Sequence, residues 1–68
     1  MKKHSIVLSG HQTSFSLEDE FWDALKQIAV KKKVSVSSLI TEIDNQRTQN
    51  LSSAIRLFVL KEYQNANI

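Results

Sequence analysis

The stretch Gln12-Thr13-Ser14-Phe15-Ser16-Leu17 decides the fold. Its odd-numbered residues are apolar or β-branched, and its even-numbered residues are polar. An alternation with a period of two residues is typical of a β-strand with one buried face and one solvent-exposed face. The sequence therefore predicts one short strand near the N-terminus, with Phe15 and Leu17 turned toward a core.

The residues before this strand allow two interpretations. Ser5-Ile6-Val7-Leu8 is also strand-like, and Ser9-Gly10 interrupts it. Either Ser9-Gly10 is a hairpin turn between two strands of one chain, or Gly10 marks a bulge or kink in a longer extended arm. We accordingly divide the chain into an N-terminal arm (1–11), a folded domain (12–64) and a frayed C-terminus (65–68).

Two amphipathic helices are expected after the strand. From Asp19 to Lys33 the apolar residues recur at steps of three and four, with acids at the start and lysines at the end, as the helix dipole favours. Ser35 is a good N-cap for a second helix, whose apolar stripe comprises Val36, Leu39, Ile40 and Ile43.

A third helix follows the polar stretch 44–50. Asn50 or Ser52 can cap it, and its apolar residues are Leu51, Ala54, Ile55, Leu57, Phe58, Val59 and Leu60. These residues cover too much of the helix surface for one neighbour, so we expect this helix to be buried from two sides. The predicted fold is mostly α-helical with one N-terminal strand.

The size of the chain and the isolated strand both favour a homodimer. A chain of 68 residues without cysteine usually needs a metal or a partner for stability, and two histidines do not form a metal-ligand cluster. An isolated strand also leaves backbone donors and acceptors unpaired. Pairing with the same strand of a second copy solves both problems, so we predict an intermolecular antiparallel two-stranded ribbon; the segment Ser5–Leu8 is the other available partner.

Composition argues against several functional classes. The single glycine disfavours loops that bind nucleotides, and no motif sets a nucleophile beside a base. We therefore expect neither an enzyme nor a bound cofactor. No apolar run approaches the ~20 residues of a membrane span, and the N-terminus lacks the features of a signal peptide. A cytoplasmic protein is expected.

The ordered set of segments resembles the ribbon-helix-helix (Arc/MetJ/CopG-like) family of DNA-binding proteins. The strand Thr13-Ser14-Phe15-Ser16-Leu17-Glu18 is followed by Phe21-Trp22-Asp23-Ala24-Leu25, and later by Glu42-Ile43-Asp44 and Asn50-Leu51-Ser52-Ser53-Ala54-Ile55-Arg56-Leu57. Together these segments look like a short, stand-alone bacterial branch of the family. The resemblance implies a two-fold dimer whose paired strands enter the major groove of double-stranded DNA.

The resemblance also implies a set of functional residues. Gln12, Ser14 and Ser16 would face base edges, and Gln12 is the best reader because a carboxamide can pair bidentately with adenine. The backbone N–H groups of Ser35, Val36 and Ser37 would face a phosphate. His11 and Lys3 are further candidate contacts to DNA. The residues assigned to the core or the dimer interface are Phe15, Leu17, Leu25, Leu39, Ile55 and Phe58.

The sequence departs from the family pattern at two places. Many relatives have glycine in the turn between the first two helices, whereas this chain has Lys33-Val34, so Lys33 is expected in a left-handed conformation. The strand face carries no arginine or lysine. Attraction to phosphates would then come from Lys2, Lys3 and the run 31–33.

Three functions follow from these observations. The first is a transcriptional repressor that reads an inverted repeat. The second is the antitoxin of a toxin–antitoxin pair, which the few residues after Tyr63 disfavour. The third is a module that binds another protein rather than DNA, built either as a dimer or as a monomer with a hairpin at 5–16.

Overall fold

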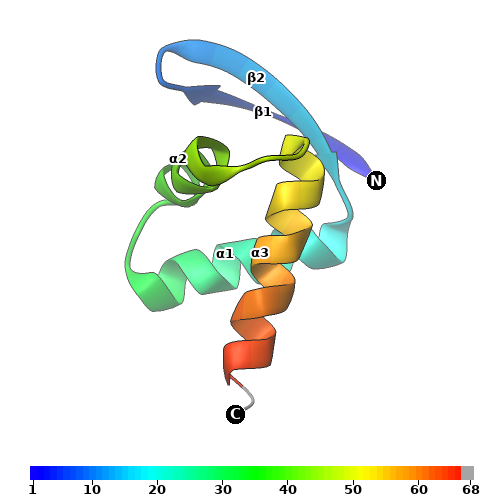
Figure 1. Cartoon of the computed structure of the whole chain (residues 1–68), viewed down its shortest axis with the longest axis vertical. Helices are drawn as coiled ribbons and strands as arrows, with labels where there is room; N and C mark the ends of the chain where they lie inside the picture. Colours follow the sequence, from blue (N-terminus) through cyan, green and yellow to red (C-terminus); the bar gives the residue numbers. More distant parts are fainter. Residues whose placement is uncertain (67–68) are drawn as a thin grey trace.

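The chain folds as a β-hairpin that lies across three α-helices (Figure 1). A computed structural model describes residues 1–66. The elements in chain order are β1 (Lys2–Leu8), β2 (His11–Leu17), α1 (Asp19–Lys32), α2 (Val36–Gln46) and α3 (Leu51–Ala66). β1 lies within the segment expected as an arm, and α3 extends to Ala66, so part of the expected frayed end, 67–68, lies outside the described residues.

A tight turn joins the two strands. Leu8 pairs with His11, and between them Ser9 and Gly10 both have positive φ, 52° and 81°. Two successive residues with positive φ are the mark of a type I′ turn, whose twist matches that of the flanking strands. The hairpin interpretation of the N-terminal segment is thereby confirmed. β2 has a partner strand within its own chain, and its pairing with a second copy stays a proposal.

The turn between α1 and α2 depends on Lys33. This residue has φ 60° and ψ 40°, the left-handed conformation expected where relatives have glycine. Its N–H donates to the carbonyl of Val30 at 3.1 Å, and the N–H of Val34 donates to that of Ala29 at 3.0 Å. These bonds satisfy carbonyl groups that the end of α1 would otherwise leave free.

Side-chain caps begin the other two helices. The Ser35 hydroxyl accepts a hydrogen bond from the Ser38 N–H at 3.0 Å, which confirms Ser35 as the N-cap of α2. At α3 the Asn50 side-chain oxygen accepts from the Ser53 N–H at 2.9 Å. Of the two caps expected for the third helix, Asn50 is therefore the one used.

The core lies between the hairpin and the helices. Its four fully buried large side chains are Leu17, Leu25, Ile40 and Ile55, one each from β2, α1, α2 and α3. Phe15 and Leu39 are also buried, and Phe58 is half-buried against the same cluster. Below the hairpin, α2 contacts β1 and α3 contacts β2. The predicted mostly helical fold is confirmed, but it has two N-terminal strands, β1 and β2, where the sequence predicted one.

The third helix packs against α1, α2 and β2 but keeps two leucines exposed. The chain buries Leu51, Ala54, Ile55 and Val59 of α3. Leu57 and Leu60 remain exposed, although the sequence predicted burial from two sides. The expectation of more than one neighbour is confirmed, because α3 packs against both α1 and α2, but these elements leave the two leucines uncovered.

Candidate nucleic-acid interface

One face of the hairpin carries only exposed side chains. The strand register pairs Lys3 with Ser16, Ser5 with Ser14, and Val7 with Gln12. All six residues are exposed, whereas the alternating positions of β2 face the helices. We call this surface the ribbon face; it comprises Lys3, Ser5, Val7, Gln12, Ser14 and Ser16.

The polar groups of the ribbon face are free to bind another molecule. Within residues 1–66 the side chains of Gln12, Ser14 and Ser16 make no hydrogen bond to the protein. Each hydroxyl can donate and accept, and the carboxamide can do both at once. The ribbon face thus offers a row of exposed hydrogen-bonding groups along β2 that bind no other part of the described chain.

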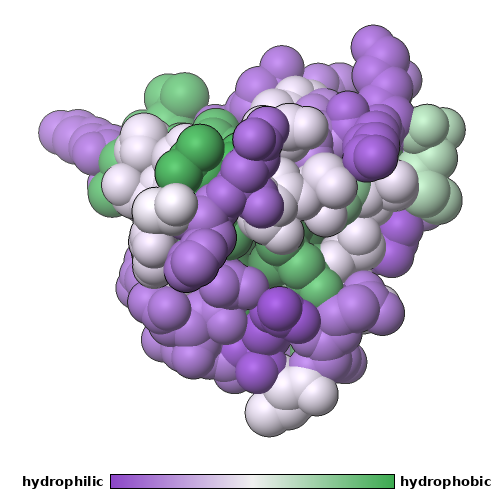
Figure 2. All heavy atoms as spheres, turned by 90° about the horizontal axis from the view of Figure 1, so that it is seen from above, coloured by the Kyte–Doolittle hydropathy of each residue, from purple (hydrophilic) through white to green (hydrophobic). Residues whose placement is uncertain are grey.

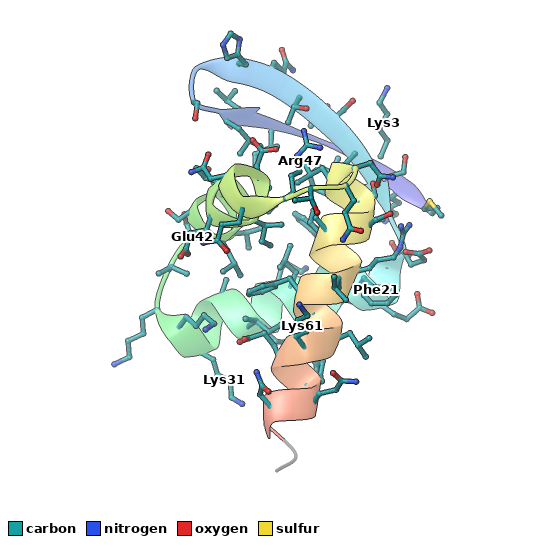
Figure 3. All side chains as sticks on the ribbon, viewed as in Figure 1. Lys3, Phe21, Lys31, Glu42, Arg47 and Lys61 are labelled. Carbon is teal, nitrogen blue, oxygen red and sulfur yellow. The ribbon has the colours of Figure 1, made fainter. Side chains whose placement is uncertain are left out.

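The charge of this surface is positive. Lys3 is the one charged residue on the ribbon face, and none of the described residues forms a salt bridge with it. It points away from the helices at the end of the hairpin near the N-terminus (Figure 3). Seen from above, the hairpin side of the molecule is mostly hydrophilic or of intermediate hydropathy, with apolar areas between (Figure 2). Such a surface can approach a polyanion without repulsion by its own side chains.

The N-terminus of α2 forms a separate cluster. Ser35 and Ser37 are exposed and Val36 is half-buried. Within the described part of the chain, the N–H groups of Val36 and Ser37 donate to no other residue, because they lie in the first turn of α2 and the Ser35 hydroxyl accepts from Ser38. Free N–H groups at a helix start favour an anion. This cluster belongs to the helix that packs against β1, not to the ribbon face itself.

Two other candidate groups do not join the ribbon face. His11 is exposed but follows the turn and pairs with Leu8. The lysine run ends α1, and Lys31 lies at the far end of the molecule from Lys3 (Figure 3). Lys32 binds Glu62 of α3 at 3.3 Å. The run therefore lies at the C-terminal end of α1, where Lys32 contacts α3. Lys2 and Lys3 are the lysines beside the ribbon face.

An ion pair fastens the hairpin to the helices. Glu18 connects β2 to α1 and accepts two hydrogen bonds from the Arg56 guanidinium of α3, at 2.8 and 3.2 Å. The Arg56 guanidinium holds the pKa of Glu18 below its ordinary value. Because the pair joins residues 38 positions apart, it couples the base of the ribbon to α3.

Sequence reasoning missed two residues of the ribbon face. Ser5 and Val7 stand opposite Ser14 and Gln12 on β1. The signal was present at Lys3 and Ser5, which alternate with His4 and Ile6, but the apolar Val7 interrupts the pattern. Val7 is exposed but lies between the half-buried Ile6 and the buried Leu8. The sequence here is therefore continuously apolar and does not show the alternation that predicts a strand with one exposed face.

A two-stranded ribbon with an outward row of polar groups, carried on helices, is the architecture of β-ribbon proteins, a class that includes readers of the DNA major groove. The comparisons agree with this geometry. A family model described as "Ribbon-helix-helix domain" matches residues 1–63, so the chain belongs to the ribbon-helix-helix family. Members are generally DNA-binding transcription regulators or antitoxins, and they typically bind DNA as dimers.

No curated protein and no solved structure matches the chain. None of the described helices has the length and apolar character needed to cross a membrane.

Proposed function

We propose that this chain is a cytoplasmic transcriptional repressor that binds double-stranded DNA sequence-specifically as a homodimer. The observation that carries the proposal is the ribbon face, where the six exposed side chains include no acid, and all of them except Val7 carry hydrogen-bonding groups that bind no other described residue. The major groove is wide enough for a two-stranded ribbon and displays a different pattern of donors and acceptors for each base pair.

Each part of the surface has a role in this proposal. Gln12 pairs with adenine through its carboxamide, and Ser14 and Ser16 make less selective contacts to neighbouring bases. Lys3 contacts a phosphate beside the groove and supplies affinity without selectivity. The N–H groups of Val36 and Ser37 hold a second phosphate at the start of α2.

The open edge of β2 supports the dimer. In an antiparallel pair, successive residues alternately direct their backbone groups toward the partner strand and away from it. The type I′ turn makes Leu8 and His11 a hydrogen-bonded pair, so Gln12, Ser14 and Ser16 direct their backbone groups away from β1. A second copy of β2 can pair there, centred on Ser14, and bring both sets of readers to one surface.

Selection of bound sequences from a random pool of DNA duplexes, followed by fluorescence anisotropy, tests the reading of bases. We expect a short inverted repeat. Gln12→Ala combined with Ser14→Ala should weaken binding to that sequence by about 10- to 100-fold, because a bidentate base contact is worth about 1–3 kcal/mol. Gln27→Ala, on an exposed position of α1, is the matched control and should bind like the unaltered chain. Equal affinity of the double variant and the control would remove the proposed readout.

The salt dependence of binding separates DNA binding from a protein-interaction function. Affinity for DNA should fall steeply as the salt concentration rises, because lysines that neutralise phosphates release the counterions condensed on the DNA. Lys3→Gln should reduce the slope of log affinity against log salt by about one for each phosphate that the lysine neutralises, for any DNA sequence. An interaction module for other proteins would show neither salt-sensitive retention on DNA nor an effect of Lys3.

A further inference from the structure

We propose that α3, which follows the strand and the two helices, supplies the helical part of the dimer interface. Leu57 and Leu60 would pack against the same residues of a second copy. This inference rests on the proposed homodimer but not on DNA binding.

The two leucines form an uncovered apolar surface. Leu57 is 41% exposed and Leu60 is 50% exposed. They are three residues apart and therefore lie on the same side of the helix. The opposite side of α3 already packs on the core through Leu51, Ile55 and Val59. Nothing in the described chain covers the leucines, so this apolar surface is available to a partner from outside it.

The position of α3 places these leucines beside the open edge of β2. The sheet order is β1–β2, α2 packs against β1, and α3 packs against β2. In Figure 1 the hairpin lies above the helices, β2 passes in front of β1, and α3 passes in front of α1. The free edge of β2 and the uncovered side of α3 therefore belong to the same flank of the molecule.

The edge of β2 points to a second copy as the occupant. A free strand edge pairs with another strand unless charge, proline or a bulge prevents it, and residues Gln12 to Ser16 contain no charge and no proline. Antiparallel pairing of β2 with itself generates a two-fold axis, and across such an axis the same surface meets itself. The two-fold axis that relates the two β2 strands therefore also brings α3 of one copy toward α3 of the other.

The surroundings of Leu57 suit such a contact. A groove of about 310 Å³ opens beside it between α2 and α3. Ile43, Ala54 and Phe58 contribute apolar surface to this groove, and Arg47 and Lys61 lie at its polar border. Leucines of the second copy can enter the groove while both cations remain in solvent. An apolar centre with a charged border is the usual anatomy of a protein interface.

Single-cysteine variants test the contact directly, because the chain has no native cysteine. Leu60→Cys and Leu57→Cys are oxidised or treated with a short bismaleimide, and the covalent dimer is measured on a denaturing gel. Val30→Cys, at another exposed apolar helix position, is the matched control. We expect crosslinked dimer from at least one α3 variant and little from the control. Equal crosslinking of all three variants, or none on α3, would overturn the proposal.

Charge at the same positions provides the second test. Leu57→Glu with Leu60→Glu should raise the dimer dissociation constant by at least about 100-fold, because like charges would meet across the two-fold axis. Val30→Glu should leave the dissociation constant unchanged. Sedimentation without DNA gives the mass, and circular dichroism checks that the helices persist. A helical α3 variant that remains as dimeric as the unaltered chain would refute the assignment.

The two proposals fail in different ways. A chain that dimerises through α3 but does not bind DNA would refute the proposed function and leave the interface standing. A chain that binds DNA but sediments as a monomer, or dimerises independently of Leu57 and Leu60, would refute the interface and leave the reading of DNA standing.

Discussion

His4 of β1 stacks on Trp22 of α1, with ring centroids 4.0 Å apart and planes inclined by 19°. Phe15 of β2 lies on the same cluster, 5.5 Å from the His4 ring. The Nε2 atom of His4 is buried and has no hydrogen-bond partner among the described residues. A buried polar atom without a partner costs about 1–3 kcal/mol. The stack therefore holds the hairpin on α1 despite an unfavourable contribution from that nitrogen.

Replacing His4 with phenylalanine should stabilise the fold. His4→Phe keeps an aromatic ring on Trp22 and removes the buried nitrogen, so we expect the free energy of unfolding to rise by about 1 kcal/mol. Urea denaturation followed by circular dichroism measures this change. His11→Phe, on an exposed position, should change stability by less than about 0.5 kcal/mol. A destabilised His4→Phe chain would show that the imidazole has a favourable role.

The contact between Glu18 and Arg56 predicts a dependence of stability on pH. Because the pKa of Glu18 is lowered from 4.5, the folded state favours the carboxylate. The resulting stabilisation is present above about pH 4.5 and is lost as the pH falls through the lower folded value. Arg56→Met should therefore reduce the melting temperature at pH 7, and the difference from the unaltered chain should shrink at pH 3.

Arg47→Met is the control for that measurement. Arg47 pairs with Asp44 at 2.7 Å, three residues away and on the surface, so its replacement should have a smaller effect at pH 7. A constant difference between Arg56→Met and the unaltered chain from pH 7 to pH 3 would exclude Glu18 as the source of the effect.

The left-handed conformation of Lys33 predicts a stabilising glycine. At φ 60° an L-residue with a side chain is strained, and glycine is not. Lys33→Gly should raise the free energy of unfolding by about 0.5–1 kcal/mol. Lys31→Gly removes the same charge from a helical position in the last turn of α1 and should lower the free energy of unfolding by up to about 1 kcal/mol. Thermal unfolding of the two variants would contradict this account if their shifts had the same sign.

Proline substitutions test whether β2 pairs with another copy. Ser14 and Ser5 are cross-strand neighbours, and both direct their N–H groups away from the hairpin, on opposite edges. Ser14→Pro removes a donor from the edge proposed for dimerisation, and Ser5→Pro removes one from the other edge. We expect sedimentation to show monomers for Ser14→Pro and dimers for Ser5→Pro. Equal masses for the two variants would argue against pairing through β2.

Local signals made much of this fold predictable. The alternation in β2 correctly assigned its two faces, and Ser35 correctly indicated a helix cap. Lys33 stands where many relatives have glycine, and its left-handed conformation was correctly predicted on that basis. These features depend on the chemistry of a few neighbouring residues. The three helices were likewise visible in the spacing of apolar side chains.

Contacts between distant segments were not predictable in this way. The bond between Glu18 and Arg56 and the stack of His4 on Trp22 depend on how the hairpin docks onto the helices. The sequence of the segment ending at Ser9-Gly10 was compatible with either a strand or an extended arm, because the apolar Val7 interrupts its alternation of polar and apolar residues. The pairing of β1 with β2 and the positive φ of both turn residues distinguish them.

Because neighbouring residues of β2 serve opposite faces, the hairpin separates two kinds of evolutionary constraint. Thr13, Phe15 and Leu17 must suit the packing beneath them, whereas Gln12, Ser14 and Ser16 contribute almost nothing to it. Substitutions at the three outward positions can therefore accumulate at little thermodynamic cost. One scaffold of this type could acquire many different target preferences through changes in a handful of codons.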